Sequence, residues 1–184
     1  MKQQKQIIDA SLLQVMLSRL CQQLIENHGQ FEDTILLGLQ PRGTFLGERI
    51  KDRLETITGI QVPLGYLDTT FHRDDFRRRS SPKAASTTKI PFLIEDKKVV
   101  LIDDVLFTGR SVRAAMDAMI TFGRPSKVEL LVLINRKYSR HLPIEPDYIG
   151  KAVNTLDTQR IVVSWQEQGQ EEGVWLSNNQ SDQT

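Results

Sequence analysis

The chain of 184 residues has one cysteine, no long apolar run and almost equal numbers of basic and acidic side chains. A single cysteine, Cys21, excludes an internal disulfide framework and a cysteine-based metal site, so we expect a small buried side chain there. The lack of a membrane-length apolar segment or a signal-peptide pattern predicts a cytoplasmic protein with no membrane partner. With 24 basic and 23 acidic side chains the net charge is +1, so any nucleic-acid binding would need a local basic patch.

The length predicts a single domain that can bury a sizeable core without metals or disulfides. Apolar residues at helical spacing predict helices over 9–28, 44–57 and 112–120, and short apolar runs predict strands over 34–39, 62–68, 99–102, 128–134 and 161–163. This order is typical of an α/β fold, so we expect a mostly parallel twisted sheet flanked by helices. Pro63 suits an edge strand at 62–68. We place the domain at 1–176 and expect 177–184 to be a disordered tail.

The stretch Val99–Ser111, VVLIDDVLFTGRS, carries the main chemical signal. Its apolar start predicts a strand buried on both faces, and Asp103 and Asp104 follow at the carboxyl end, where open α/β sheets bind ligands. A short turn containing Thr108 and Gly109 then leads into a helix. Amides of such a turn and of a helix N-terminus bind phosphate, whereas carboxylates suit sugar hydroxyls or a phosphate-bound Mg²⁺. A phosphorylated sugar would satisfy both halves of this stretch.

Two other segments fit the same interpretation. The strand at 34–39 is followed by a turn with Arg42 and Gly43 and then by a helix, which predicts a second anion site beside the first. Such a turn is more often structural when it occurs alone. The segment 69–90 is polar, basic and without apolar periodicity, which predicts a mobile loop that closes over the anionic ligand. A solvated run of charges is the alternative for this loop.

The stretch Val99–Ser111 resembles the phosphoribosyl pyrophosphate (PRPP) motif of type I phosphoribosyltransferases. It differs from a Walker A loop, which needs GxxxxGK[ST]. A response-regulator strand could also end in LIDD, but it would lie near the start of a chain and lack the TGRS turn. The segments LLGLQPRG, LDTTFHRDD, GRPSKVELLVL and LPIEPDYIGK extend the likeness over about residues 5–175. Together they are similar to the bifunctional pyrimidine operon attenuators and uracil phosphoribosyltransferases.

The resemblance implies that uracil and PRPP react to give UMP and pyrophosphate, with Mg²⁺ as the cofactor. It implies catalytic roles for Asp103, Asp104 and Arg73, with Mg²⁺ held through PRPP and Asp103 as its candidate protein ligand. It also implies a hood over about 135–165, in which uracil contacts Ile149, Gly150 and Lys151. The residues expected to bind PRPP are Arg42, Gly43, Asp103, Asp104, Val105, Leu106, Phe107, Thr108, Gly109, Arg110 and Ser111.

The family's second function is binding of pyrimidine-operon leader mRNA, with UMP or UTP strengthening the complex, by proteins that form homodimers or larger assemblies. The RNA-binding residues that this resemblance implies are Ser18, Arg19, Arg140 and Lys151. Gln22 and Asn27 stand where the family usually has a histidine and an arginine, and 136–141 also departs from the family's pattern. Losing these cations should weaken RNA binding. The alternative function is a non-catalytic RNA-binding transcription regulator that senses nucleotide through the PRPP site; the acid pair and the Arg42–Gly43 turn argue against it.

Overall fold

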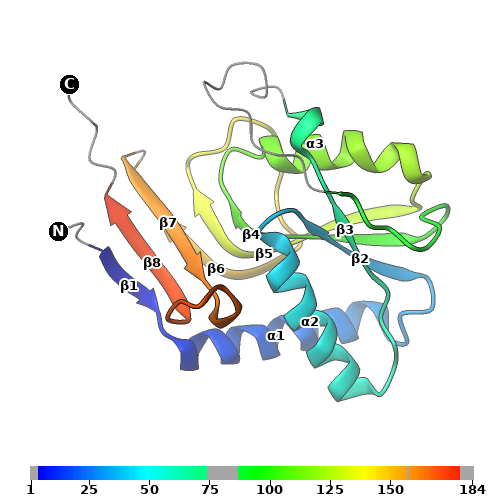
Figure 1. Cartoon of the computed structure of the whole chain (residues 1–184), viewed down its shortest axis with the longest axis horizontal. Helices are drawn as coiled ribbons and strands as arrows, with labels where there is room; N and C mark the ends of the chain where they lie inside the picture. Colours follow the sequence, from blue (N-terminus) through cyan, green and yellow to red (C-terminus); the bar gives the residue numbers. More distant parts are fainter. Residues whose placement is uncertain (1–3, 74–86, 157, 179–184) are drawn as a thin grey trace.

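Figure 1 shows the computed structural model of the chain, which describes residues 4–73, 87–156 and 158–178. The described residues form two β-sheets and three α-helices, with short 3-10 turns between some of them. In chain order the elements are β1 (Gln4–Ile8), α1 (Ala10–His28), β2 (Thr34–Leu39), α2 (Gly43–Thr58), β3 (Leu64–Leu67), η1 (Thr70–His72), β4 (Lys98–Leu106), α3 (Arg110–Met119), η3 (Ile120–Phe122), β5 (Lys127–Lys137), β6 (Tyr148–Asn154), β7 (Gln159–Ser164), η4 (Gln166–Gln168) and β8 (Gly173–Asn178).

The central sheet has five parallel strands in the order β3-β2-β4-β5-β6. Helices α1 and α2 cover one face and α3 covers the other, so the sheet lies between two apolar cores (Figure 1). This arrangement confirms the predicted α/β fold with a parallel sheet, and β3 lies at its edge as Pro63 indicated. Because all five strands run the same way, the turns after β2 and β4 meet at one edge of the sheet.

The first helix begins and ends as its sequence predicts. The Asp9 side chain accepts a hydrogen bond from the Leu12 amide at 2.8 Å, which caps the N-terminus of α1. Gly29 ends the helix with a positive φ of 55°, and its amide donates to the Ile25 carbonyl. Cys21 lies on the buried face of this helix, as expected of a small apolar side chain.

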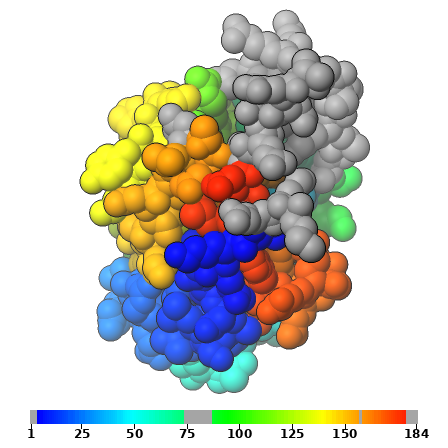
Figure 2. Space-filling view, turned by 90° about the vertical axis from the view of Figure 1, so that its left-hand side faces the viewer, coloured from blue at the N-terminus to red at the C-terminus, as the bar shows by residue number. Residues whose placement is uncertain are grey.

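A second sheet of three antiparallel strands, β1-β8-β7, stands at one end of the molecule. Figure 2 faces this end and shows β1 lying against β8. No local sequence pattern predicted β1 or β8, because both strands are short and are held mainly by pairing with distant parts of the chain. Ser177 and Asn178 belong to β8, so the predicted tail at 177–184 is wrong for these two residues. Residues 179–184 lie outside the described residues.

The hood expected over 135–165 is not one unit. Residues 148–154 form β6 in the central sheet, where Leu131 of β5 is paired with Tyr148, and only 159–164 join the end sheet as β7. The strand β6 was missed because Tyr148 is its only fully buried side chain. Of the loop expected over 69–90, residues 74–86 lie outside the described residues. Next to them, Lys89 pairs with Tyr66 through two backbone hydrogen bonds of 2.8 Å.

Candidate functional site

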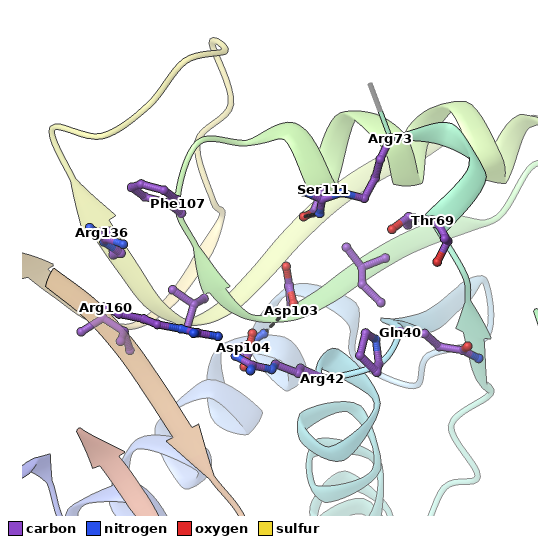
Figure 3. Close-up of a pocket in the computed structure, with 15 residues that line it drawn as sticks. Gln40, Arg42, Thr69, Arg73, Asp103, Asp104, Phe107, Ser111, Arg136 and Arg160 are labelled. Atoms are coloured by element: carbon purple, nitrogen blue, oxygen red, sulfur yellow. Dashed lines mark hydrogen bonds between the residues drawn. The ribbon is translucent and has the colours of Figure 1, made fainter. Parts of the chain in front are cut away.

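A cavity of about 300 Å³ opens at the carboxyl edge of the central sheet, between the turns that follow β2 and β4 (Figure 3). It combines carboxylates, cationic side chains and a few apolar groups. Its walls come from both sheets, because β7 of the end sheet closes one side. The lining residues are Leu39, Gln40, Pro41, Arg42, Thr69, Thr70, Arg73, Asp103, Asp104, Val105, Phe107, Ser111, Arg136, Arg160 and Ile161.

Neither helix that begins beside this cavity is capped by the side chain of its N-cap residue, although the Arg110 amide at the start of α3 makes a long hydrogen bond of 3.5 Å to the Thr108 hydroxyl. Helix α2 starts after Arg42 and α3 starts after Gly109, and neither of these residues caps its helix through its side chain. By contrast, α1 is capped by Asp9. Uncapped first-turn amides carry a partial positive charge and can bind an anion. The two helix N-termini beside the acid pair are therefore suited to binding anions.

The acid pair lies at the end of β4, between these two helix N-termini. Asp103 is half-buried and Asp104 is buried, and the Asp104 amide donates to Asp103 Oδ1 at 3.0 Å. Burial and the neighbouring carboxylate of Asp104 raise the pKa of Asp103 well above its ordinary value. Burial also raises the pKa of Asp104, against the opposing effect of the Arg42 guanidinium. In Figure 3, Arg42 and Arg160 point toward Asp104 from opposite sides.

The turn after β2 is held close to β4 by Gly43. A Cβ atom at this position would collide with the carbonyl oxygen of Ile102 and lie 3.2 Å from the Asp103 Cα. Only glycine lets the start of α2 approach the acid pair this closely. The expected pairing of the Arg42–Gly43 turn with the acid pair is therefore present in the fold, and Arg42 lines the cavity.

The Phe107–Ser111 turn follows β4 and includes the first residues of α3. Gly109, with a φ of 89°, lies directly before α3 begins at Arg110. Arg73 donates from Nη1 to the Ser111 hydroxyl at 2.7 Å, which brings the start of the 69–90 segment onto this turn. Five residues expected to bind PRPP are not among those that line the cavity: Gly43, Leu106, Thr108, Gly109 and Arg110. Among them, Leu106 is buried. Its side chain is 2% exposed and packs in the core under α3, so only its backbone is available to a ligand.

Two arginines in the cavity wall were not predicted. Arg136 is buried, donates from Nε to the Thr155 hydroxyl at 2.7 Å, and lies 3.9 Å from the centre of the Phe107 ring. Arg160 reaches the cavity from β7 (Figure 3). Arg136 belongs to β5 and Arg160 to β7, and neither residue is part of a recognisable sequence motif. The sequence offered one weak signal, which is that Arg136 follows the strand predicted over 128–134 after a single residue, Asn135.

The three residues expected to bind the base are not among those that line the cavity. Ile149, Gly150 and Lys151 lie on β6, beyond β5 in the central sheet. The carbonyl oxygens of Ile149 and Gly150 accept hydrogen bonds from Nη2 of Arg19. A backbone group that is already paired with Arg19 is a poor candidate for reading uracil, so this prediction finds no support in the geometry.

The residues expected to bind RNA are largely paired within the protein. The Ser18 hydroxyl donates to the Gln14 carbonyl at 3.0 Å and accepts from Arg53 at 2.6 Å, and Arg19 is bound to the carbonyls of β6. Arg140 donates to the Phe107 carbonyl and to the Asn135 side chain. Lys151 is exposed.

The acid pair fits a metal ion that is held mainly by a substrate. Asp104 Oδ2 is buried with no hydrogen-bond partner in the described part of the chain, and carboxylate oxygens are ligands that Mg²⁺ prefers. Within residues 4–73, 87–156 and 158–178, no three His, Cys, Asp or Glu side chains converge to hold a metal ion. Substrate oxygens would have to complete such a site. The same described residues contain no helix that is long and apolar enough to cross a membrane.

Comparisons with known proteins agree with this geometry. The family model "Phosphoribosyl transferase domain" matches residues 3–168. Two relatives carry the name "Bifunctional protein PyrR": one from Enterococcus faecalis is 39% identical over 173 residues, covering 94% of this chain and 96% of that protein. The other, from Oceanobacillus iheyensis, is 45% identical over 179 residues, covering 96% of this chain and 98% of that protein.

Solved structures of other phosphoribosyltransferases share the fold. A hypoxanthine phosphoribosyltransferase from Staphylococcus aureus superimposes with a TM-score of 0.68 at 16% identity, covering 95% of this chain and 90% of that chain. The hypoxanthine phosphoribosyltransferase from Trypanosoma cruzi gives a TM-score of 0.71 at 10% identity, covering 96% of this chain and 91% of that chain. At such identities the likeness concerns the fold alone. The family model and the close relatives together show that the chain belongs to the phosphoribosyl transferase family and, within it, to the bifunctional PyrR proteins.

Proposed function

We propose that this chain is a cytoplasmic uracil phosphoribosyltransferase, which converts uracil and PRPP to UMP and pyrophosphate. The observation that carries the proposal is the position of the acid pair between two uncapped helix N-termini in one cavity. PRPP has a sugar with hydroxyl groups, a phosphate on C5 at one end and a pyrophosphate on C1 at the other. Two anion positions on either side of two carboxylates match that order of groups.

In this reaction the N1 atom of uracil forms a bond to C1 of the ribose while the bond from C1 to pyrophosphate breaks. Positive charge develops on the sugar ring, and the proton on N1 of uracil passes to solvent water. Asp103 and Asp104 would accept hydrogen bonds from the ribose hydroxyls and stabilise that positive charge. Because the two carboxylates are held on a rigid strand, little reorganisation is needed when the charge appears.

The two helix N-termini would then divide the phosphoryl groups between them. The turn Phe107–Ser111 would bind the 5′-phosphate through the first amides of α3 and the Ser111 hydroxyl, with Arg73 beside it. The Arg42–Gly43 turn would bind pyrophosphate through the first amides of α2. Uracil would lie toward Val105, Ile161 and Arg160, the remaining wall of the cavity.

Mg²⁺ fits this proposal as a cofactor that enters with PRPP. Asp103 and Asp104 are the side chains that would hold it together with substrate oxygens. The ion would neutralise charge on the pyrophosphate and so make it a better leaving group. Arg42 and Arg73 line the same cavity and would share that role with their fixed positive charges.

A second function, nucleotide-sensitive binding of a pyrimidine-operon leader mRNA, is favoured by the word "Bifunctional" in the names of the relatives. UMP or UTP would act through the cavity described above, and the protein would work as a homodimer or a larger assembly. The exposed Lys151 is the candidate whose side chain is open to an RNA phosphate. The rival remains a regulator that binds RNA and nucleotide without catalysis.

A panel of bases tests the proposal directly. The purified protein is mixed with PRPP, Mg²⁺ and either uracil, orotate, hypoxanthine, guanine or adenine, and nucleotide formation is followed by chromatography. We expect UMP from uracil and background rates with the other bases. Preferred turnover of a purine base would contradict the assignment of uracil. Tight binding of leader RNA without turnover of any base would establish the rival function.

A further inference from the structure

The segment 135–144, which leaves the end of β5, packs against the turn that follows β4. The His141 amide donates to the Thr108 carbonyl at 3.0 Å. Leu142 and Ile144 lie against Gly109, since a Cβ placed on that glycine would be 3.2–3.5 Å from their side chains. The 135–144 segment therefore forms a rigid backing for the turn expected to bind the 5′-phosphate.

The side chain of Arg140 joins the two strand ends through hydrogen bonds. Its Nη1 donates to the Phe107 carbonyl, and its Nη2 donates to Asn135 Oδ1 at 2.6 Å. Its Nε is buried and has no acceptor in the described part of the chain. The neighbouring Lys137 and Tyr138 are exposed, and Tyr138 is 91% exposed. Arg140 is thus folded inward where its neighbours face solvent.

The peptide group explains why these contacts matter for a ligand. In a trans peptide the C=O of one residue and the N–H of the next point in opposite directions. Arg140 holds the Phe107 C=O and the His141 amide holds the Thr108 C=O, so the N–H groups of Thr108 and Gly109 both point away from the 135–144 segment. Two successive amides are fixed in this way at the entrance to α3.

We propose that Arg140 is a positioning residue for the 5′-phosphate, which orients the amides of the Phe107–Ser111 turn without touching the ligand. This inference rests on the proposed function for the identity of the sugar phosphate. It differs from the role in RNA binding that the family resemblance implies for Arg140. An RNA contact would have to use the guanidinium N–H groups that these two acceptors leave free.

Two simple ligands separate the two anion positions. Ribose 5-phosphate carries the 5′-phosphate alone, and inorganic pyrophosphate with Mg²⁺ occupies the position at α2 alone. Their affinities are measured by calorimetry for the wild type, Arg140→Ala, Arg140→Lys and the control Lys137→Ala. The control removes a positive charge from an exposed position close to Arg140.

We expect Arg140→Ala to weaken ribose 5-phosphate binding and to raise the KM for PRPP, each by about tenfold, as for loss of a charge-assisted hydrogen bond. Pyrophosphate affinity and the KM for uracil should stay within about twofold. The ribose 5-phosphate affinity of Arg140→Lys should lie between those of Arg140→Ala and the wild type, because one ammonium can keep one of the two contacts. Lys137→Ala should match the wild type.

Unchanged ribose 5-phosphate affinity in both Arg140 variants would overturn the proposal, as would an equal loss for ribose 5-phosphate and pyrophosphate. Loss of affinity for a leader RNA stem-loop with normal ribose 5-phosphate binding would assign Arg140 to RNA instead. If Arg140→Ala does not fold, Arg140→Lys decides. Since ribose 5-phosphate binding needs no turnover, a wild type that binds it but makes no UMP would refute the proposed function and leave this test intact.

Discussion

Gly43→Ala is the substitution whose effect can be derived most fully from the structure. The added Cβ would overlap the Ile102 carbonyl oxygen and lie 3.1 Å from the carbon of the same carbonyl. Ordinary contacts between non-bonded heavy atoms are about 3.5–4.0 Å, so the start of α2 must retreat from β4 by about 1 Å. The backbone of Gly43 has an ordinary negative φ, and the effect is therefore one of crowding rather than of forbidden dihedral angles.

This retreat should affect turnover far more than stability. A displacement of about 1 Å at a positioning group can lower a rate by about 100-fold, and overpacking costs about 1–3 kcal/mol. For a domain of this size, each kcal/mol lost from the free energy of unfolding lowers Tm by about 2–4 °C. We therefore expect a folded variant whose kcat/KM for PRPP falls by about 100-fold and whose affinity for pyrophosphate falls with it.

Gly29→Ala is the matched control. Gly29 also has a structural role, because its φ of 55° favours glycine, but no atom lies within 4 Å of a Cβ placed there. Gly29 has a φ of 55° and a ψ of −107°, a backbone conformation that costs a side-chain-bearing residue about 1–3 kcal/mol, so the control should lose similar stability and keep its kinetic constants. Steady-state kinetics compares kcat/KM between the two variants, and thermal unfolding compares their Tm. Equal kcat/KM in the two variants would refute the claim that close approach of α2 to the acid pair serves the reaction.

Three further predictions concern single side chains. Asp104→Asn should lower kcat by about 100- to 1,000-fold, as for loss of one preorganised electrostatic group, and near-normal turnover in a UMP assay would contradict this. Burial lowers the pKa of His28 below its ordinary 6.5, against the opposing effect of the Glu129 carboxylate. The contribution of neutral His28 to stability is therefore complete above pH 6.5 and is lost as the pH falls below that value. The free energy of unfolding in urea should then change less between pH 7.5 and pH 5.5 in His28→Gln than in the wild type. An equal change in the two proteins would refute this. Burial raises the pKa of the Cys21 thiol to about 11, so a thiol reagent at pH 8 should modify only unfolded protein, and rapid modification of the native chain would contradict its burial.

Elements with a clear local pattern were predictable from the sequence. The long apolar stripe of α1, its Asp9 cap and its Gly29 end are all local signals, and so is the buried run at the start of β4. The strand β1 has no such signal, since three of its five residues are exposed. It exists because β8 pairs with it from the far end of the chain. Sequence patterns do not report that kind of contact.

The same distinction applies to the site. The PRPP-like stretch gave the acid pair and the Phe107–Ser111 turn because strand, turn and helix are adjacent in the chain. Arg136 and Arg160 reach the cavity from strand ends that only the folded sheets bring together, and an arginine outside a motif is most often a solvated surface residue. The assignment of the base to Ile149–Lys151 relied on resemblance alone, whereas the structure uses two of those carbonyls to hold Arg19.

A crystal structure with bound UMP tests most directly whether the acid pair and the N-terminus of α3 hold one phosphorylated ribose. We predict that the ribose hydroxyls hydrogen-bond to Asp103 and Asp104, and that the phosphate lies on the amides of residues 108–111. A phosphate bound instead at the Arg42–Gly43 turn, or a UMP outside this cavity, would contradict the account.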